Sequence, residues 1–251
     1  MCSTGPTAAP YRPILKATDC ASPSQSSPSP PAKLPPCTGA IRCSGAGSSL
    51  VRLRQGRSVP FITPVTEEEA TGRVAEVFAA ERRGRGYVPN YLSLFALRPD
   101  VYEAWGKLSA SIKANMDLRR YELATLAAAQ ALSSSYCALA HCLVLRDKFL
   151  DETELINVVN GETSKEADRA VMTLSRKVAL DASRITESDL APLRQIGLSD
   201  EEIFDVILAA AARAFFSKTL DATGTEADRE YRDLLGPDLS GRLAVGRPIE
   251  L

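Results

Sequence analysis

The chain has 251 residues, of which 45% are hydrophobic and 24% are charged, and its formal net charge is -1. This composition is ordinary for a soluble globular protein. The near-zero net charge gives no electrostatic basis for binding nucleic acid or an anionic membrane. The most apolar stretch, 204–216, is interrupted by Asp205 and Arg213, so the sequence predicts no membrane-spanning helix.

Residues 1–58 differ in composition from the rest of the chain. They hold nine of the 16 prolines, many serines and a single acidic residue, Asp19. Such a segment buries too little apolar surface to offset the entropy lost on ordering, so we predict a disordered tail. Three interpretations stay open: an organellar transit peptide, a flexible tail with a binding role, and a start site assigned too far upstream of an initiator at Val59.

The six cysteines are distributed in a way that argues against a disulfide framework. Four of them lie in the tail, and only Cys137 and Cys142 lie in the body of the chain. A helical core of this size needs no disulfide, and cytosolic thiols normally stay reduced. We therefore expect a cytoplasmic protein.

From Thr66 onward the chain shows the signals of helix starts and ends. Three pairs of residues fit the capping box and predict helix starts: Thr66 with Glu69, Thr163 with Glu166, and Ser199 with Glu202. Apolar residues at helical spacing form four faces: Val74, Val77 and Phe78; Val101, Trp105, Leu108 and Ile112; Val171, Leu174 and Val178; and Ile203, Val206, Ile207 and Ala210. Glycines stand where helices should end: Gly84, Gly161 and Gly224. Alanine-rich stretches at 124–131 and 208–214 favour closely packed helices, so residues 59–251 are predicted to form an all-α bundle of about eight helices.

The chemical signal lies around the only histidine of the chain. Residues 119–123 open an alanine-rich helix, and three consecutive serines at 133–135 predict a break before a new helix. Cys137 then falls in the first turn of that helix, where unpaired backbone amides and the helix dipole favour a thiolate. His141 lies one turn further along the same face, so the pair is a candidate activated nucleophile with its base. The alternative is structural, because free cysteine is among the most buried residue types and a lone histidine often packs in a core.

The run from Glu122 through Tyr136 and Cys137 to His141 resembles the AhpD-like, carboxymuconolactone decarboxylase superfamily, and within it the alkylhydroperoxidase (peroxidase-related) branch. The motif of that family is a glutamate, then Cys-x-x-Cys, then a histidine four residues after the second cysteine. Glu122, Cys137 and His141 match the glutamate, the second cysteine and the histidine. Segments 60–64 and 198–203 also look like that branch, so the resemblance covers roughly residues 59 to 235.

The resemblance implies an AhpD-like helical bundle that assembles as a homo-oligomer and reduces peroxides with a thiol. Cys137 would be the thiol that attacks the peroxide, His141 would exchange its proton, and Glu122 would orient or recharge the histidine. Tyr136 adjoins the site as a supporting residue, and we interpret it as a packed aromatic. The first cysteine of the motif falls on Ser134, which either caps the new helix, the interpretation we favour, or donates a hydrogen bond to a thiolate.

The missing first cysteine changes the expected reaction cycle. Cys142 is no substitute, because residues five apart on a helix lie roughly 8–9 Å apart at their Cα atoms, and a disulfide needs less than about 7 Å. Peroxide would give a sulfenic acid at Cys137, which an external thiol must reduce. A carboxymuconolactone decarboxylase-like lyase, or a non-catalytic oligomer that keeps the fold, are the alternatives. The sequence shows no nucleotide-binding fingerprint and no four convergent metal ligands, so we expect no cofactor, no metal, and no nucleic-acid or membrane partner.

Overall fold

The computed structural model describes residues 60–251, so the predictions made for residues 1–58 and for Val59 lie outside the described part of the chain. Within that part the chain forms ten α-helices, one short 3-10 helix (Ala182–Arg184) and no β-sheet, which confirms the predicted all-α class. The helices are α1 (Gly72–Arg85), α2 (Asn90–Phe95), α3 (Pro99–Ala114), α4 (Leu118–Ala131), α5 (Ser135–Lys148), α6 (Glu152–Asn160), α7 (Glu166–Asp181), α8 (Glu187–Gln195), α9 (Asp200–Thr223) and α10 (Glu230–Leu243). The last is bent at Gly236, directly before a proline that cannot continue a straight helix.

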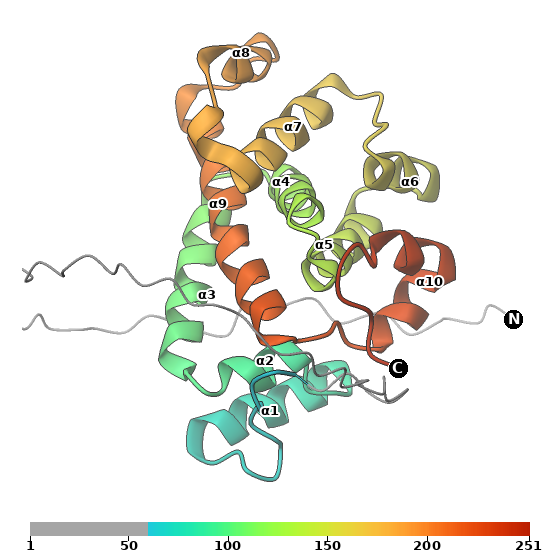
Figure 1. The fold of residues 1–251 in the computed structure, drawn as a ribbon. Coiled ribbons are helices and arrows are strands. Elements are labelled where there is room, and N and C mark those ends of the chain that lie inside the picture. The colour runs from blue at the N-terminus through green and yellow to red at the C-terminus, as the bar shows by residue number, and fades with distance from the viewer. Residues whose placement is uncertain (1–59) are drawn as a thin grey trace, which may run out of the picture. The chain divides into compact units, whose positions relative to one another are not determined.

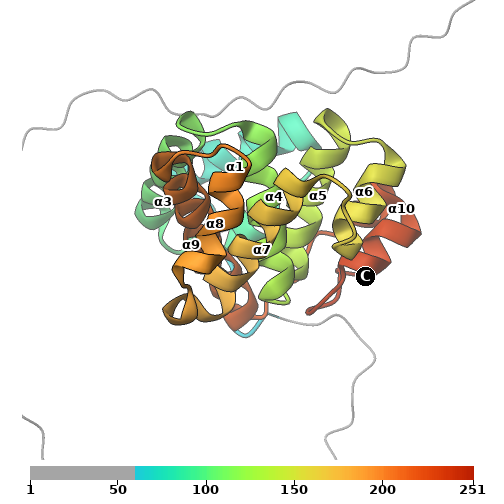
Figure 2. The same ribbon diagram turned by 90° about the horizontal axis from the view of Figure 1, so that it is seen from above.

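Helix α4 lies at the centre of the bundle. It packs against α5, α7 and α9. In the two views of Figures 1 and 2, α9 and α3 lie on one side of α4, and α5, α6 and α10 lie on the other. Four of its alanines are fully buried (Ala124, Ala127, Ala128 and Ala129), so the alanine-rich sequence lets three neighbours approach it closely, as predicted.

Helix α4 also joins the two hydrophobic clusters of the core. One cluster gathers α5, α6 and α10 around side chains such as Leu126 and Leu139. The other gathers α7, α8 and α9 around side chains such as Leu174 and Val206. Because α4 contributes side chains to both clusters, two of its faces are buried. A polar side chain on either face must therefore find its hydrogen-bond partner inside the protein.

The three predicted capping boxes have different outcomes. The pair at Ser199 and Glu202 forms both reciprocal bonds and starts α9, as predicted. The pair at Thr66 and Glu69 also forms both bonds, but it closes a turn, and α1 begins only at Gly72. The prediction at Thr163 is wrong: its hydroxyl accepts a hydrogen bond from the amide of Lys165, two residues on, so α7 begins later, at Glu166.

The predicted helix ends and apolar faces hold with two exceptions. Gly161 and Gly224 end α6 and α9 in the left-handed conformation, whereas α1 runs past Gly84 and ends at Gly86. The faces of α1, α7 and α9 point inward as predicted. The face on α3 does not stay buried along its length, because Val101 and Leu108 are 39% and 49% exposed.

The C-terminal residues cross the start of α5. The amide of Gly246 donates a hydrogen bond to the hydroxyl of Ser135 at 2.9 Å, and a Cβ atom on this glycine would overlap the carbonyl oxygen of Ser133. Arg247 donates to the carbonyl of Asp221 at the end of α9. This segment therefore ties α9 to the turn that precedes α5.

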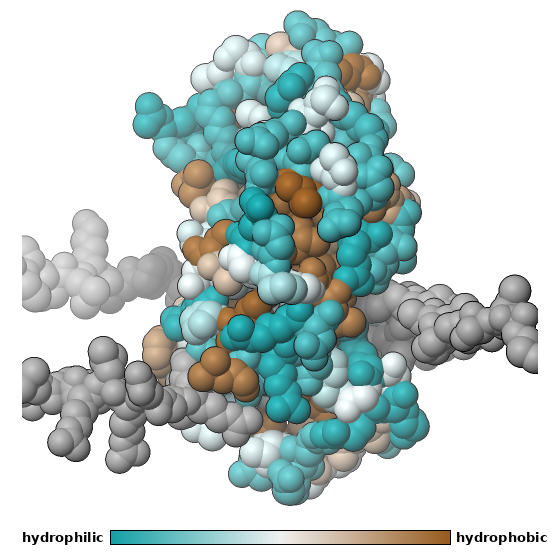
Figure 3. All heavy atoms as spheres, turned by 90° about the vertical axis from the view of Figure 1, so that its right-hand side faces the viewer, coloured by the Kyte–Doolittle hydropathy of each residue, from teal (hydrophilic) through white to brown (hydrophobic). Residues whose placement is uncertain are grey.

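The surface of the described domain is mostly polar on the side that carries α6 and α10. Figure 3 shows hydrophobic atoms there as small patches between hydrophilic ones. No helix among residues 60–251 has the length and apolarity needed to cross a membrane.

Candidate functional site

The turn between α4 and α5 places the candidate cysteine. Helix α4 ends at Ala131, Ser133 takes a left-handed φ of 55°, and α5 begins at Ser135, so the break predicted from the serines is confirmed. Ser134 occupies the N-cap position of α5, but its side chain makes no capping bond. Its ψ is 93°, whereas Ser199, which does cap α9, has a ψ of 166°. The Ser134 hydroxyl is buried without a hydrogen-bond partner, so both predicted bonds of this residue, to the helix start and to the cysteine, are absent.

Glu122 and His141 form a buried pair. Nδ1 of His141 lies 2.5 Å from Oε2 of Glu122, and the two residues are 8% and 4% exposed. Since a carboxylate accepts hydrogen bonds, Nδ1 carries the proton and donates it, which leaves the lone pair of Nε2 free. The structure thus brings these two residues together across α4 and α5, as the family motif implied.

The imidazole of His141 is neutral at pH 7. Burial is the largest cause that lowers its pKa, and the positive charge of Arg213 is the second. The Glu122 carboxylate opposes both, and the pKa settles at about 4. A neutral imidazole with an oriented ring can accept a proton, but its pKa of about 4 makes it a weak base that passes the proton on.

Arg213, on α9, supplies the positive charge next to the candidate thiol. Its Nη1 donates a hydrogen bond to Sγ of Cys137 at 3.6 Å, and the two residues are 7% and 2% exposed. Burial alone would lower the Arg213 pKa, but Cys137 and Tyr121 raise it above its usual value, so the guanidinium stays charged. Cys137 is therefore buried, but beside a cation and not in hydrocarbon alone.

Aromatic side chains surround this guanidinium. Its carbon lies 5.5 Å from the ring centre of Trp105 on α3 and 5.4 Å from that of Phe216 on α9. Aromatic faces attract cations, and the attraction is stronger where water is excluded. The rings of Tyr121 and His141 pack edge to face, with their centres 6.2 Å apart. Side chains from α3, α4 and α9 therefore cover the site on α5.

Two further residues of the sequence analysis have structural roles. The hydroxyl of Tyr136 donates to Asp228 at 2.6 Å, and its ring packs edge-on against Tyr231, which agrees with its interpretation as a packed aromatic. Cys142 is fully buried, and burial raises its pKa to about 12. A thiol in this state agrees with the predicted packing role.

Sequence reasoning missed Arg213 as a member of the site. It noticed this residue only as an interruption of an apolar stretch. That interruption was the available signal, because an arginine inside an alanine-rich buried helix must find a partner within the protein.

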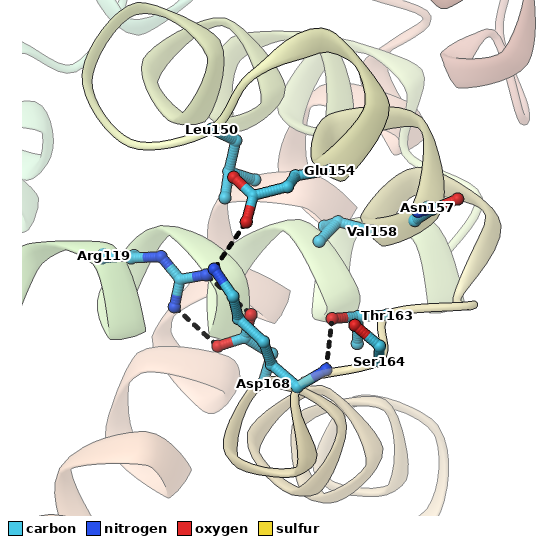
Figure 4. A pocket seen from close by; sticks show the side chains of 9 residues that line it. Arg119, Leu150, Glu154, Asn157, Val158, Thr163, Ser164 and Asp168 are labelled. Carbon is cyan, nitrogen blue, oxygen red and sulfur yellow. Dashed lines mark hydrogen bonds and ion pairs between the residues drawn. The ribbon is translucent and has the colours of Figure 1, made fainter.

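A second polar pocket lies apart from this site, between α4, α6 and α7 (Figure 4). Its volume is about 30 Å³. Arg119 makes a two-pronged ion pair with Asp168 at 2.6 and 2.7 Å, and Lys165 pairs with Glu154 at 2.6 Å. Because these charges neutralise one another, the pocket offers no unpaired charge to a ligand.

Comparison with known proteins places these residues within a family segment. Residues 99–176 match the model of the carboxymuconolactone decarboxylase family, and this segment includes Glu122, Cys137 and His141. No curated protein matches the chain. The family match agrees with the resemblance to the carboxymuconolactone decarboxylase superfamily found in the sequence, over residues 99–176.

Solved structures share the fold at low sequence identity. A peroxidase-related protein from Ralstonia eutropha, described as an alkylhydroperoxidase AhpD core, has a TM-score of 0.61 and 20% identity over 69% of this chain and 94% of its own. A peroxidase-related protein from a Silicibacter species has a TM-score of 0.55 and 17% identity over 73% of this chain and 97% of its own. The debrominase Bmp8, as a cysteine-to-alanine variant in complex with 2,3,4-tribromopyrrole, has a TM-score of 0.58 and 18% identity over 69% of this chain and 94% of its own. The shared fold thus occurs in proteins named for more than one reaction.

Proposed function

Because residues 99–176 belong to the carboxymuconolactone decarboxylase family and the fold is that of peroxidase-related proteins, we propose that the protein is a thiol-dependent, peroxidase-type oxidoreductase that reacts through Cys137. One observation carries the proposal: the Arg213 guanidinium donates to the Cys137 sulfur at 3.6 Å. A cation beside a sulfur favours the thiolate, which is the nucleophilic form of cysteine.

The first step oxidises the sulfur and reduces the peroxide. The thiolate attacks one peroxide oxygen, an S–O bond forms, and the O–O bond breaks. The second oxygen leaves as an alkoxide or hydroxide and takes up a proton, and Cys137 becomes a sulfenic acid. The proton that the thiol gives up passes through Nε2 of His141 to the leaving oxygen without staying on the imidazole, whose pKa is about 4, and Glu122 holds the ring through Nδ1.

The second half of the cycle uses an external thiol. Cys142 is fully buried and its pKa is raised to about 12, so it is a poor resolving thiol. An external thiol condenses with the sulfenic acid to give a mixed disulfide and water. A second thiol then displaces Cys137 and leaves as the disulfide product. The cytoplasm, where we propose that the protein works, supplies such thiols.

Peroxide consumption with excess dithiothreitol tests this proposal. The proteins are the wild type, Cys137→Ser, His141→Gln, and Cys142→Ala as the matched control from the same helix. We expect Cys137→Ser to lose turnover, His141→Gln to be slower by about 100-fold, and Cys142→Ala to keep its rate. Equal rates in the wild type and Cys137→Ser overturn the proposal.

The same variants separate the alternative reactions. Lactone decarboxylation that persists in Cys137→Ser assigns the lyase reaction. If the protein debrominates a bromopyrrole, this reaction depends on Cys137, and no peroxide is consumed, the protein is a debrominase. A protein with none of these activities is a non-catalytic member of the family.

The proposal includes assembly as a homo-oligomer. Large apolar side chains on α3 and α9 support it, since each is at least 39% exposed on two neighbouring helices: Val101, Leu108, Phe204 and Phe215. Analytical ultracentrifugation gives the mass in solution, and a monomer at all concentrations contradicts this part.

A further inference from the structure

We infer that a file of buried water runs between α5 and α9 from Asp221 to the Cys137 sulfur, and that it admits small hydroxylic substrates such as hydrogen peroxide while excluding bulky hydroperoxides. The inference rests on the proposed function, because it names the substrate class of the same site.

A substrate cannot reach Cys137 from the open surface. The residue is 2% exposed, and Arg213, itself 7% exposed, lies directly against its sulfur. Trp105 and Phe216 pack around that guanidinium. Any molecule that reacts with the sulfur must therefore pass through the interior of the protein.

Several buried polar atoms on α9 and directly before α5 have no hydrogen-bond partner in the protein. Among residues 60–251, five buried side-chain atoms lack a hydrogen-bond partner, and three of them are Ser134 Oγ, Ser217 Oγ and Arg213 Nε. Buried polar atoms almost always have a partner, and where the protein offers none, the partner is internal water. Arg213 and Ser217 belong to α9, Ser134 precedes α5, and these two helices contact each other, so we assign the three atoms to one hydrated path.

The helix positions order these atoms into a line. Arg213, Ser217 and Asp221 are four residues apart on α9, so they share one face over about 12 Å of helix. At one end, Arg213 contacts Cys137. At the other end, Asp221 lies about two helical turns beyond Arg213 on the same face of α9. Asp221 is only half-buried, so this end of the line reaches the solvent.

The chemistry of such a file selects its contents. Hydrogen peroxide donates and accepts hydrogen bonds as water does, so it can exchange with water along hydroxyl groups. An aryl or long-chain hydroperoxide makes no such exchange between two packed helices. The hydroxide released in the first step, once protonated, leaves as water by the same route.

Replacing Ser217, the middle residue of the line, by a side chain without a hydroxyl group tests the inference, because it removes a polar atom from the proposed path. The variant is Ser217→Val, and the matched control is Ser175→Val, whose serine is also fully buried but bonds to the carbonyl of Val171 within α7. Modification of Cys137 is followed by mass spectrometry of its peptide, with hydrogen peroxide, cumene hydroperoxide and methyl methanethiosulfonate as probes. The last is a small thiol reagent without a peroxide bond.

We expect the wild type to react with hydrogen peroxide about tenfold faster than with cumene hydroperoxide, and Ser217→Val to slow hydrogen peroxide and the thiosulfonate by about tenfold. Ser175→Val should keep the wild-type rates. Ser217→Thr, which adds one methyl group and keeps the hydroxyl, gives a smaller slowing and serves if the valine variant does not fold.

Each remaining outcome decides a different question. Wild-type rates in both Ser217 variants overturn the file. Cumene hydroperoxide reacting as fast as hydrogen peroxide overturns the size limit. A wild type that reacts with the thiosulfonate and with neither peroxide overturns the proposed function, and the thiosulfonate rates of Ser217→Val then still test the file.

Discussion

Replacing Arg213 by methionine should slow the thiolate chemistry of Cys137 more than any other single change on α9. At the observed 3.6 Å, a full negative charge on the sulfur and the guanidinium charge attract each other by about 5 kcal/mol at an effective dielectric constant of about 20. Much of this attraction is offset by the cost of burying the two charges, and a hydrogen bond to a charged group contributes a net of about 1.5–3 kcal/mol. Since about 1.4 kcal/mol is a factor of ten, we expect Cys137 in Arg213→Met to be alkylated about 10- to 150-fold more slowly at pH 7.

The assay is alkylation by iodoacetamide, followed on the Cys137 peptide. Cys142 serves as an internal reference, because burial raises its pKa to about 12 against the opposing charge of Arg146, and Arg213 is not among the groups that shift it. It also reports folding, since an unfolded variant would expose both thiols. Arg213→Lys keeps the charge without the planar donor group, and its rate should fall between the other two.

The matched control is Arg120→Met. Arg120 also links two helices, through a 2.8 Å ion pair with Glu202, but this pair is partly exposed and does not involve Cys137. We expect this variant to react at the wild-type rate. An Arg213→Met protein that is folded and alkylated as fast as the wild type refutes the role assigned to the guanidinium, because the sulfur would then react without it.

Three further experiments test the structure independently of activity. Burial lowers the His141 pKa from 6.5 to about 4, so the free energy of unfolding falls as pH drops through this range and the histidine must take up a proton. Burial raises the Asp228 pKa from 3.8 to about 6, so the free energy of unfolding falls as pH rises through that range and the carboxyl must lose a proton. Between pH 4 and 6, denaturant unfolding of Asp228→Asn should therefore give a free energy that rises with pH, and that of His141→Gln a free energy that falls with pH. Gly246→Ala should cost about 1–3 kcal/mol and expose the C-terminus to proteolysis, whereas Gly241→Ala, with open space around it inside α10, should be neutral or slightly stabilising. Ser199→Ala removes the cap of α9 and should cost about 1 kcal/mol in urea unfolding; no change would show that the box bonds do not hold the helix start.

What the sequence could predict depended on interactions between residues close in the chain. The end of α4, the break at 133–135 and the start of α5 follow from three serines with poor helix propensity. The Ser199 cap and the glycine at the end of α9 are likewise complete within a few residues. The spacing of Glu122, Cys137 and His141 placed two of these side chains on one helix and the third on the preceding helix.

The predictions that failed depended on interactions that a short sequence pattern does not contain. Thr163 offered the same hydroxyl as Ser199, but Lys165 took the bond and delayed the helix by two residues. Ser134 stands at the N-cap position as predicted, but it follows a left-handed residue, its ψ is 93°, and its hydroxyl makes no capping bond. The contact of Arg213 with Cys137 joins residues 76 positions apart, so it depends on how α9 packs and not on any short spacing.

The contact between Arg213 and Cys137 changes the roles that we assign to the residues of the site. The sequence motif predicts that His141 activates Cys137 as its base, but the His141 imidazole is neutral at pH 7, because burial and then the Arg213 charge lower its pKa to about 4. In the proposed function, the positive partner of a Cys137 thiolate is therefore Arg213, and His141 only moves protons. It follows that His141→Gln should slow peroxide turnover while leaving the alkylation rate of Cys137 near that of the wild type, whereas Arg213→Met should slow both. Loss of alkylation in His141→Gln would mean that the imidazole, and not the guanidinium, holds the charge of the sulfur.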